Sequence, residues 1–315
     1  MMTFDEKLRN SINNFDNITK PDYTRNELNL YVDFVELIAT KYVEDGITLA
    51  DIQDRFFGEK DYSNAEQRDK DENFLQSIFL LVVERVLLYD DHYPFVYDTT
   101  TLKVKSDLTA KNKLYISLLF SSKLNLFKDF KTELTTEFEI ISYSVLREFL
   151  PNNSIVKEFG KNTAYTGNAI GKIRQLAGDL NLDINEYELS CVSERNQQER
   201  GLDIVGWIPF DDGCKNKIIF LGQCACGKEY ESKQHDTRRF EQYLNFYKTK
   251  PQHTMFIPYS LLNVREGKFY HSDLIENDFL IFERKRIIEL HNQDLDSSES
   301  FTIVDNFLTY PRSAI

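Results

Sequence analysis

Apolar positions recur with helical spacing through the first half of the chain, which predicts a mainly helical region. Thr48, followed three residues later by Asp51, is typical of a helix N-terminus that comes close to a capping box. Segment 58–72 is charged and almost without large apolar side chains, so it is expected to be a surface loop. The segments whose apolar side chains stand three and four residues apart, as on a helix that packs against a core, are 26–45, 49–57, 73–89, 111–127 and 132–150.

The pattern changes after Pro151, where the polar segment 152–154 interrupts the helical spacing. A break of this kind is typical of a domain boundary. It divides the chain into a mainly helical domain, 1–150, and a second domain, 151–315. Outside the hairpin described next, the second domain is expected to contain helices at 165–180 and 235–248, strands at 188–192 and 254–259, and a strand or a helix at 280–290.

Two apolar runs rich in β-forming residues predict a hairpin at the centre of the second domain. The first run is 201–207 and the second is 218–222, and Asp211-Asp212-Gly213 between them is a strong turn signal. A hairpin brings the start of its first strand beside the end of its second. The sequence therefore predicts that Asp203 and Gln223 are neighbours in space.

Asp203 and Gln223 are the strongest candidates for chemistry. A carboxylate and an amide oxygen suit Mg²⁺, which prefers oxygen ligands and keeps several waters. A glutamine buried in an apolar run without a partner costs about 1–3 kcal/mol, which favours a polar site around Gln223. Lys228 follows Gly227 and could steady a phosphate or orient a water. The ordinary alternatives are a capping aspartate at a strand edge and a turn lysine in solvent.

Gly-x-Asp at the start of one strand and glutamine at the end of the next resemble the PD-(D/E)xK restriction-endonuclease-like superfamily, over roughly residues 154–290. The glutamine is similar to the Mrr-type branch. The resemblance implies a helical N-terminal domain followed by an αβββαβ domain with a mixed central sheet, in the α+β or α/β class. The superfamily pattern has a lysine two residues after the glutamine, where this chain has Ala225, and Lys228 is the nearest substitute.

The resemblance also implies an activity, a cofactor and a set of site residues. The protein would be an endonuclease that hydrolyses phosphodiester bonds with Mg²⁺ or Mn²⁺. Asp203 and Gln223 would hold the metal, and Glu199 would complete the metal site. Lys228 would polarise the attacking water or stabilise the developing charge. The superfamily often adds an acid from its first helix, but the expected first helix, 165–180, has no acid on its predicted inner face.

The resemblance further implies DNA as the substrate and a bacterial defence context, such as restriction or abortive infection. The helical domain 1–150 would then sense a trigger or bind a partner protein that supplies targeting or energy, because the chain has no phosphate-binding loop motif of its own. The alternative is a catalytically inactive interaction subunit of a defence complex. Ala225 at the expected lysine position favours this alternative.

The net charge of −13 argues against a general nucleic-acid coat protein, because phosphate binding relies on Lys and Arg. A nuclease can still present a local basic rim. Helices 26–45 and 49–57 resemble a helix-turn-helix at a coarse level, but their acidic flanks favour an ordinary helical pair. The candidate nucleic-acid-binding residues are Lys228, Lys233, Arg238 and Arg239, with Lys248 and Lys250 further along.

Four cysteines around the hairpin raise the possibility of a structural zinc module. Their spacing is poor for zinc, which prefers two Cys-x₂₋₄-Cys pairs. Cys224 and Cys226 share one face if they lie on a strand, so they are expected to pack beneath the site. A nucleophilic cysteine paired with His235 or His253 lacks any motif. The four cysteines are Cys191, Cys214, Cys224 and Cys226.

The chain has no run of about 18 apolar residues that would predict a membrane span. Its first ten residues are polar and lack the apolar region of a signal peptide. Four cysteines among 315 residues do not make a disulfide framework. The sequence therefore predicts a cytoplasmic protein that does not bind membranes.

Overall fold

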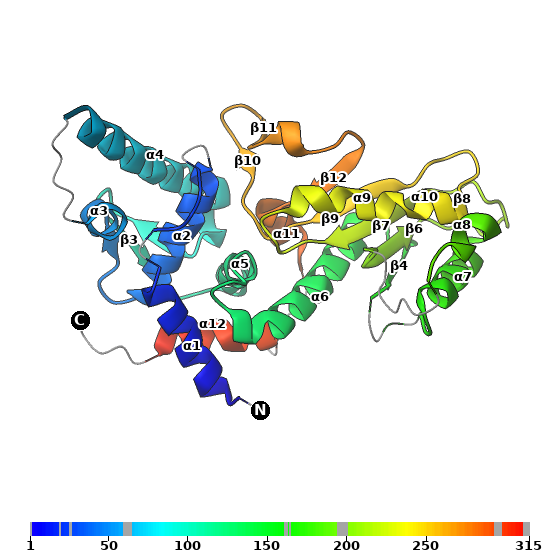
Figure 1. Ribbon diagram of the computed structural model, residues 1–315, viewed down its shortest axis with the longest axis horizontal. Helices are drawn as coiled ribbons and strands as arrows, with labels where there is room; N and C mark the ends of the chain where they lie inside the picture. Colours follow the sequence, from blue (N-terminus) through cyan, green and yellow to red (C-terminus); the bar gives the residue numbers. More distant parts are fainter. Residues whose placement is uncertain are drawn as a thin grey trace. The chain divides into compact units, whose positions relative to one another are not determined.

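The protein forms two compact units, each built from separate stretches of the chain (Figure 1). The computed structural model describes residues 2–18, 20–24, 27–58, 65–160, 163, 165–193, 201–292 and 298–310. We call Met1–Glu137, Tyr259–Tyr270 and Asp294–Ile315 the helical unit. We call Phe138–Pro258 and His271–Gln293 the sheet unit. This division differs from the expected boundary after residue 150.

The difference arises because the chain passes between the units four times. Helix α6 (Lys131–Phe149) begins in the helical unit and ends in the sheet unit. Residues 259–270 leave the sheet unit and return to the helical unit, where they form the hairpin of β10 (Leu262–Asn263) and β11 (Lys268–Phe269). The C-terminal helix α12 (Glu299–Thr309) also belongs to the helical unit.

The helical unit confirms most of the predicted helices. Thr48 caps α3 (Leu49–Phe57) with the predicted capping box, in which its side chain accepts from Asp51 N–H and Asp51 accepts from Thr48 N–H. One prediction was wrong, because residues 65–72 form the start of a long helix rather than a loop. The remaining elements are α1 (Phe4–Asp16), α2 (Leu28–Lys41), β1 (Ile47–Thr48), α3 (Leu49–Phe57), α4 (Ala65–Tyr89), β2 (Phe95–Tyr97), β3 (Thr101–Val104) and α5 (Ala110–Ser121).

A mixed five-stranded sheet forms the centre of the sheet unit, in the order β12-β9-β7-β6-β4. Strand β6 runs antiparallel to both β4 and β7, whereas β7, β9 and β12 run parallel to one another. The predicted hairpin is confirmed by the register that pairs Ile204 with Gly222. The strands are β4 (Ile155–Glu158), β6 (Ile204–Trp207), β7 (Ile219–Cys224), β9 (Gln252–Phe256) and β12 (Phe279–Phe282).

Helices cover both faces of this sheet. On one face, α6 approaches β6 so closely that a Cβ added to Gly206 would lie 3.3 Å from Leu146 Cδ2. On the other face, α7 (Ala169–Leu180) and α10 (Phe240–Tyr243) share a buried apolar core with alternate residues of β6 and β7. The structure is therefore a mixed helix-and-sheet protein in which the sheet unit has three layers.

Several predictions for the second domain were wrong in detail. Residues 186–190 form helix α8 (Glu186–Ser190) where a strand was expected at 188–192, because the Asn185 side chain caps the N-terminus of a helix there. The helix expected at 165–180 is α7, which begins at Ala169, and strand β4 was not predicted. The helix expected at 235–248 is α9 (Gln234–Arg238) plus α10, and the chain turns at Leu244 into the short strand β8 (Leu244–Asn245), which pairs with β5 (Asp183–Ile184).

Both alternatives offered for segment 280–290 are present, since β12 is followed by α11 (Arg284–Leu290). Glu283 caps this helix by accepting from Arg286 N–H. Among the residues that the structure describes, no helix combines the length and the apolar character that a membrane crossing requires.

Candidate functional site

The hairpin brings Asp203 and Gln223 to neighbouring positions, as the sequence predicts. Asp203 lies immediately before β6, and its N–H donates to the Gly222 carbonyl at 2.9 Å. Its carboxylate Oδ2 accepts from Cys224 N–H at 2.7 Å. Asp203 is thus hydrogen-bonded to Gly222 and Cys224, the residues on each side of Gln223. These two bonds fix the position of Gln223 on β7 relative to Asp203.

Gln223 is buried, with 6% of its surface exposed, and its amide is only half satisfied. Nε2 donates to Asp236 Oδ2 at 3.3 Å, a long hydrogen bond. Oε1 has no hydrogen-bond partner among the described residues. A buried amide oxygen without a partner is costly, so its persistence here indicates a place prepared for a ligand or a water.

Asp236 on α9 is a site residue that the sequence analysis missed. Its side chain is 15% exposed, and it also pairs with Arg239 at 3.2 Å. Gly201 explains how α9 comes so close, because a Cβ at Gly201 would lie 2.3 Å from Asp236 Cβ. The glycine of Gly-x-Asp is therefore required for the approach of the helix, and its φ of +81° also favours glycine.

On the α6 side, the end of β7 carries two thiols next to carboxylates. Burial raises the pKa of Cys224, and the charge of Asp203 raises it further, although a hydrogen bond with Ser142 opposes both. Burial and the charge of Glu139 raise the pKa of Cys226. Both thiols therefore stay protonated near neutral pH, and thiolate chemistry is disfavoured at this edge.

Glu139 is a second residue that the sequence analysis missed. It stands on α6, which lies outside the helix 165–180 to which the expectation of no inward acid applied. Its Oε2 lies 3.6 Å from where a Cβ of Gly160 would be, at the end of β4. Acids from three parts of the chain, Glu139, Asp203 and Asp236, therefore lie near the ends of β4 and β7 and the start of β6. We call these three acids and Gln223 the strand-end site.

Lys228 does not join this cluster. It is exposed, and within the described residues it makes no hydrogen bond or ion pair. Ala225, at the position where the superfamily pattern expects lysine, is 6% exposed. Glu199 lies outside the described residues.

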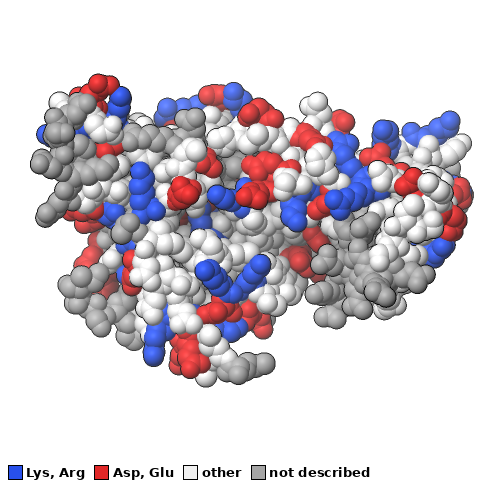
Figure 2. All heavy atoms as spheres, in the orientation of Figure 1, with Lys and Arg blue, Asp and Glu red and all other residues white. Residues whose placement is uncertain are grey.

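The predicted basic rim is partly engaged in internal contacts. Arg238 Nε donates to Glu276 Oε2 at 3.0 Å, and Arg239 pairs with Asp236. Lys228 and Lys233 are exposed. On the face drawn in Figure 2, Lys and Arg side chains lie interspersed with Asp and Glu. An open groove of about 560 Å³ beside Arg238 is lined mainly by acids and other polar residues of segment 272–278.

The cysteines and histidines do not form the alternative sites. Cys191 and Cys214 are exposed, and their sulfurs lie against the Tyr187 carbonyl and the Asn216 N–H. Across the described part of the chain, no three His, Cys, Asp or Glu side chains are placed to hold one metal ion. The imidazoles have acidic partners, since His253 bonds to Glu241 and His235 pairs with Glu276.

The helical unit contains a separate polar cluster that is sealed from solvent. Arg85 is 2% exposed, and its Nη1 lies 2.7 Å from Asp33 Oδ1 and 2.8 Å from Glu36 Oε1. Tyr93 and Tyr115 also donate to Glu36. Burial lowers the pKa of Arg85, but Glu36, Tyr115 and Asp33 outweigh that effect and raise it well above its usual range.

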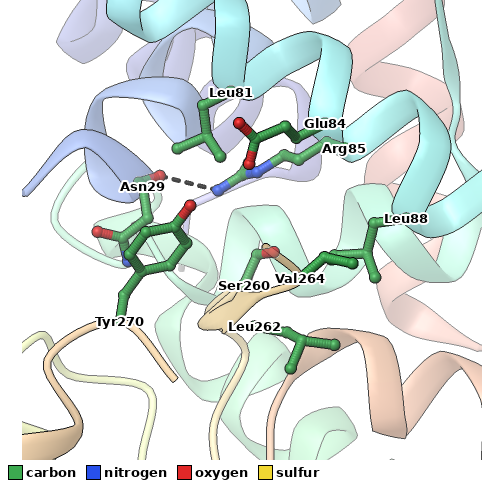
Figure 3. Close-up of a pocket in the computed structure, with 9 residues that line it drawn as sticks. All are labelled: Asn29, Leu81, Glu84, Arg85, Leu88, Ser260, Leu262, Val264 and Tyr270. Atoms are coloured by element: carbon green, nitrogen blue, oxygen red, sulfur yellow. Dashed lines mark hydrogen bonds between the residues drawn. The ribbon is translucent and has the colours of Figure 1, made fainter. Parts of the chain in front are cut away.

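A small cavity adjoins this cluster (Figure 3). Its volume is about 10 Å³, room for roughly one water. Arg85 donates across it to the Asn29 carbonyl at 2.9 Å, and Ser260 and Tyr270 complete its wall. A cavity of this size suits a structural water rather than a substrate, so the sheet unit holds the better candidate site.

Comparison of the chain with protein-family models, with curated proteins and with solved structures finds no match. The similarity of the Gly-x-Asp and glutamine positions to the restriction-endonuclease-like superfamily therefore stays a prediction. Any conclusion about function depends on the geometry of the strand ends.

Proposed function

We propose that this protein is a metal-dependent nuclease that hydrolyses phosphodiester bonds, with DNA as the expected substrate. The order of elements supports a restriction-endonuclease-like core, since α6, β4, β6, β7, α9 with α10, and β9 follow the sequence αβββαβ once the inserted elements are left aside. The insertions are α7, β5 and α8 between β4 and β6, and β8 before β9. Asp203 stands before the second strand of this core and Gln223 near the end of the third. Both positions match the superfamily pattern.

One observation carries the proposal, namely the buried Oε1 of Gln223 that has no partner among the described residues. Mg²⁺ binds oxygen donors and needs only one or two protein carboxylates, because waters and substrate phosphates fill its remaining positions. Asp203 and Gln223 supply such donors and would hold Mg²⁺ or Mn²⁺. The bound ion would neutralise charge on the phosphate and acidify a water.

The residues around this pair define what the protein itself contributes. Hydrolysis joins the oxygen of one water to phosphorus and breaks one P–O bond, while the water gives up a proton and the leaving oxygen gains one. The Cys224 N–H fixes the orientation of the Asp203 carboxylate. Asp236 orients the Gln223 amide by accepting from Nε2, which leaves Oε1 as the oxygen that faces a ligand. Both contacts prepare the donors before substrate arrives.

A second candidate function is an interaction subunit that keeps this fold without catalysis. Buried Ala225 and exposed Lys228 favour it, because the lysine that the superfamily pattern expects is missing from β7. In either case the proposed context is bacterial defence, and the helical unit would sense a trigger or bind a protein partner.

The test is cleavage of linear and supercoiled DNA by the full chain with Mg²⁺ or Mn²⁺. Wild type is compared with Asp203→Ala, Lys228→Ala and a control, Asp183→Ala, which removes a carboxylate of the same unit that is 68% exposed. We expect metal-dependent cutting that Asp203→Ala abolishes and that the other two variants retain. Equal loss in Asp183→Ala would point to a contaminating nuclease or a folding defect.

Absence of cutting by wild type with either metal would contradict the nuclease. The interaction subunit would then be tested by co-purification with DNA and with proteins from the host cell. Thermal melting of each variant shows whether a lost activity reflects lost structure.

A further inference from the structure

Exposed aromatic side chains concentrate in one part of the sheet unit. Among the residues that the structure describes, three aromatic residues are more than half exposed, namely Tyr187 (76%), Phe210 (61%) and Tyr247 (59%). A single exposed apolar residue is ordinary on a protein surface. These three stand on segments that contact one another, so their concentration calls for a functional reason.

Phe210 and Tyr247 lie on two loops at the end of the sheet opposite the strand-end site. Strand β6 begins at the strand-end site and β7 ends there, so the turn between them, 208–218, lies at the other end. Strand β9 runs parallel to β7, so the loop before it, 246–251, lies at the same end as the turn. Because β7 has six residues, about 20 Å separates the two ends.

Polar contacts hold these loops and the neighbouring helix α8 together. Thr249 Oγ1 donates to Asn216 Oδ1 at 2.7 Å, which joins one loop to the other. Lys215 pairs with Asp183 of β5 at 2.5 Å, and β5 pairs with β8, which leads into the second loop. Helix α8, which carries Tyr187, follows β5 and lies at the end of the sheet unit that carries β8 (Figure 1). The exposed rings therefore belong to one surface.

Lysines accompany the rings in both loops. Segments 208–218 and 246–251 contain four lysines and two aspartates, in a chain whose net charge is −13. Lys248 Nζ lies 5.5 Å from the centroid of the Tyr247 ring. The side chain of Lys250 is 88% exposed, and its distance to Glu241 is long at 3.8 Å. Lys248 and Lys250 thus lie at this end of the sheet and not beside the strand-end site. The four lysines are Lys215, Lys217, Lys248 and Lys250.

Exposed rings beside ammonium groups suit one class of ligand. The phosphates of a nucleic acid pair with lysines, and the face of an aromatic ring stacks on a base. In a double helix the base faces are covered by neighbouring bases, so the rings favour a single strand. An acidic protein segment would use the lysines but leave Phe210 and Tyr247 without a role.

We propose that Phe210, Tyr247 and the four lysines bind single-stranded nucleic acid, and we call them the turn-end surface. The inference goes beyond the proposed function, because binding here requires neither a metal nor cleavage. It applies equally to the nuclease and to the interaction subunit. In the nuclease, a strand held on this surface would raise the local concentration of nucleic acid around the strand-end site.

The first experiment tests the rings. Fluorescence anisotropy in EDTA measures binding of the full chain to labelled oligothymidylate and oligouridylate of about 15 nucleotides. Phe210→Ala and Tyr247→Ala should each weaken binding about tenfold, the scale of one stacked base, whereas Phe210→Trp and Tyr247→Trp should retain it. The control is Leu87→Ala, which removes a 78%-exposed apolar side chain of the helical unit and should bind like wild type.

The second experiment tests the lysines. Each phosphate contact to a single strand contributes about 0.7 to the slope of log affinity against log salt concentration. A chain with both Lys217→Gln and Lys250→Gln should therefore lower that slope by about 1.4. The matched control combines Lys70→Gln and Lys268→Gln, whose side chains are 60% and 58% exposed, and should leave the slope unchanged.

Several results would overturn the proposal. No binding of either strand by folded wild type at low salt is one. Unchanged affinity in both Phe210→Ala and Tyr247→Ala, or equal affinity for an abasic strand of the same length, is another, because the lysines would then act as a general anion surface. Tighter binding of a duplex of the same sequence would also contradict it.

Other results separate the turn-end surface from the nuclease proposal. Asp203→Ala should bind both strands like wild type in EDTA, since it alters only the strand-end site. Strand binding without any metal-dependent cutting would retain the turn-end surface and reject the nuclease. Tighter binding of oligouridylate than of oligothymidylate would support the surface and identify RNA as the strand that it takes, and the reverse order would identify DNA.

Discussion

The Arg85 cluster of the helical unit and the strand-end site of the sheet unit contain similar groups in different states. Each combines carboxylates from neighbouring elements with an arginine, Arg85 in one and Arg239 beside Asp236 in the other. At Arg85, the carboxylates of Asp33 and Glu36 both contact the guanidinium. The hydroxyls of Tyr93 and Tyr115 donate further hydrogen bonds to Glu36. At the strand ends, the Gln223 oxygen lacks a partner among the described residues, and Asp236 is partly exposed.

The contrast shows how to distinguish a polar cluster that stabilises the fold from a polar cluster that can bind a ligand. A sealed cluster whose groups satisfy one another stabilises one arrangement of its helices and leaves little for a ligand to bind. A cluster with an unpartnered acceptor beside a partly exposed acid retains binding capacity at some cost in stability. Three substitutions and one pH series would break or sharpen this comparison.

The largest effect is expected from Arg85→Met. The substitution leaves Asp33 and Glu36 buried without their cation, which costs about 3–5 kcal/mol in unfolding free energy. Urea denaturation of the full chain measures it. The control is Arg68→Met on the same helix, whose 62%-exposed guanidinium pairs with Glu72, and it should change stability by less than about 0.5 kcal/mol. Similar values for both variants would contradict the importance of the buried cluster.

Gly201→Ala should have the next largest effect, at the strand-end site. The new Cβ would meet Asp236 at 2.3 Å and would sit at a φ of +81°, so about 1–3 kcal/mol is expected from backbone strain alone, with the clash added. Gly213→Ala is the matched control, because its φ of +71° has the same strain but nothing lies within 4 Å. Denaturation curves should show the larger loss at Gly201, and equal losses would argue against close packing of α9.

His253 provides a pH-dependent comparison within the sheet unit. Burial lowers the pKa of its imidazole below the usual value of 6.5, although the bond to Glu241 opposes the shift. The unfolded chain then binds the proton more readily, so this histidine stabilises the fold fully above about pH 6.5 and less as pH falls through its folded pKa. The melting temperature of wild type should fall more between about pH 8 and pH 5 than that of His253→Gln. Parallel pH profiles would contradict this assignment.

The smallest effect on stability is expected from Gln223→Met. Methionine removes one long hydrogen bond to Asp236 and also the oxygen that has no partner among the described residues, so the two changes nearly cancel and the loss should stay within about 1 kcal/mol. The same type of replacement at Arg85 is expected to be several times more costly. A large loss at Gln223, measured by the same denaturation assay, would place it with the structural polar groups.

Local patterns predicted the central hairpin because its strands are apolar and a strong turn lies between them. Strand β4 was missed because Ile155 is exposed and Lys157 and Glu158 are charged, as is common on an edge strand. The start of α4 was missed because its first two turns are charged and exposed, so no apolar period marks them.

The site was predictable only in part. Asp203 and Gln223 stand out because each interrupts an apolar run. Glu139 and Asp236 lie on helices where a single charged residue is ordinary, and only the packing of α6 and α9 against the strand ends brings them to the site. The spacing of residues along the sequence does not show which helices pack against the strand ends.

Helix α6 has a consequence for how this protein can be divided experimentally and how it could have evolved. A fragment cut at Pro151 would lose Leu146 and Leu150, and with them the cover over Gly206 in the central sheet. It would also retain 259–270 without the helices against which that loop folds. Because each unit is built from separate segments, neither unit can be transferred as one continuous stretch of the chain. Recombination would have to transfer the sheet and its neighbouring helices as one piece.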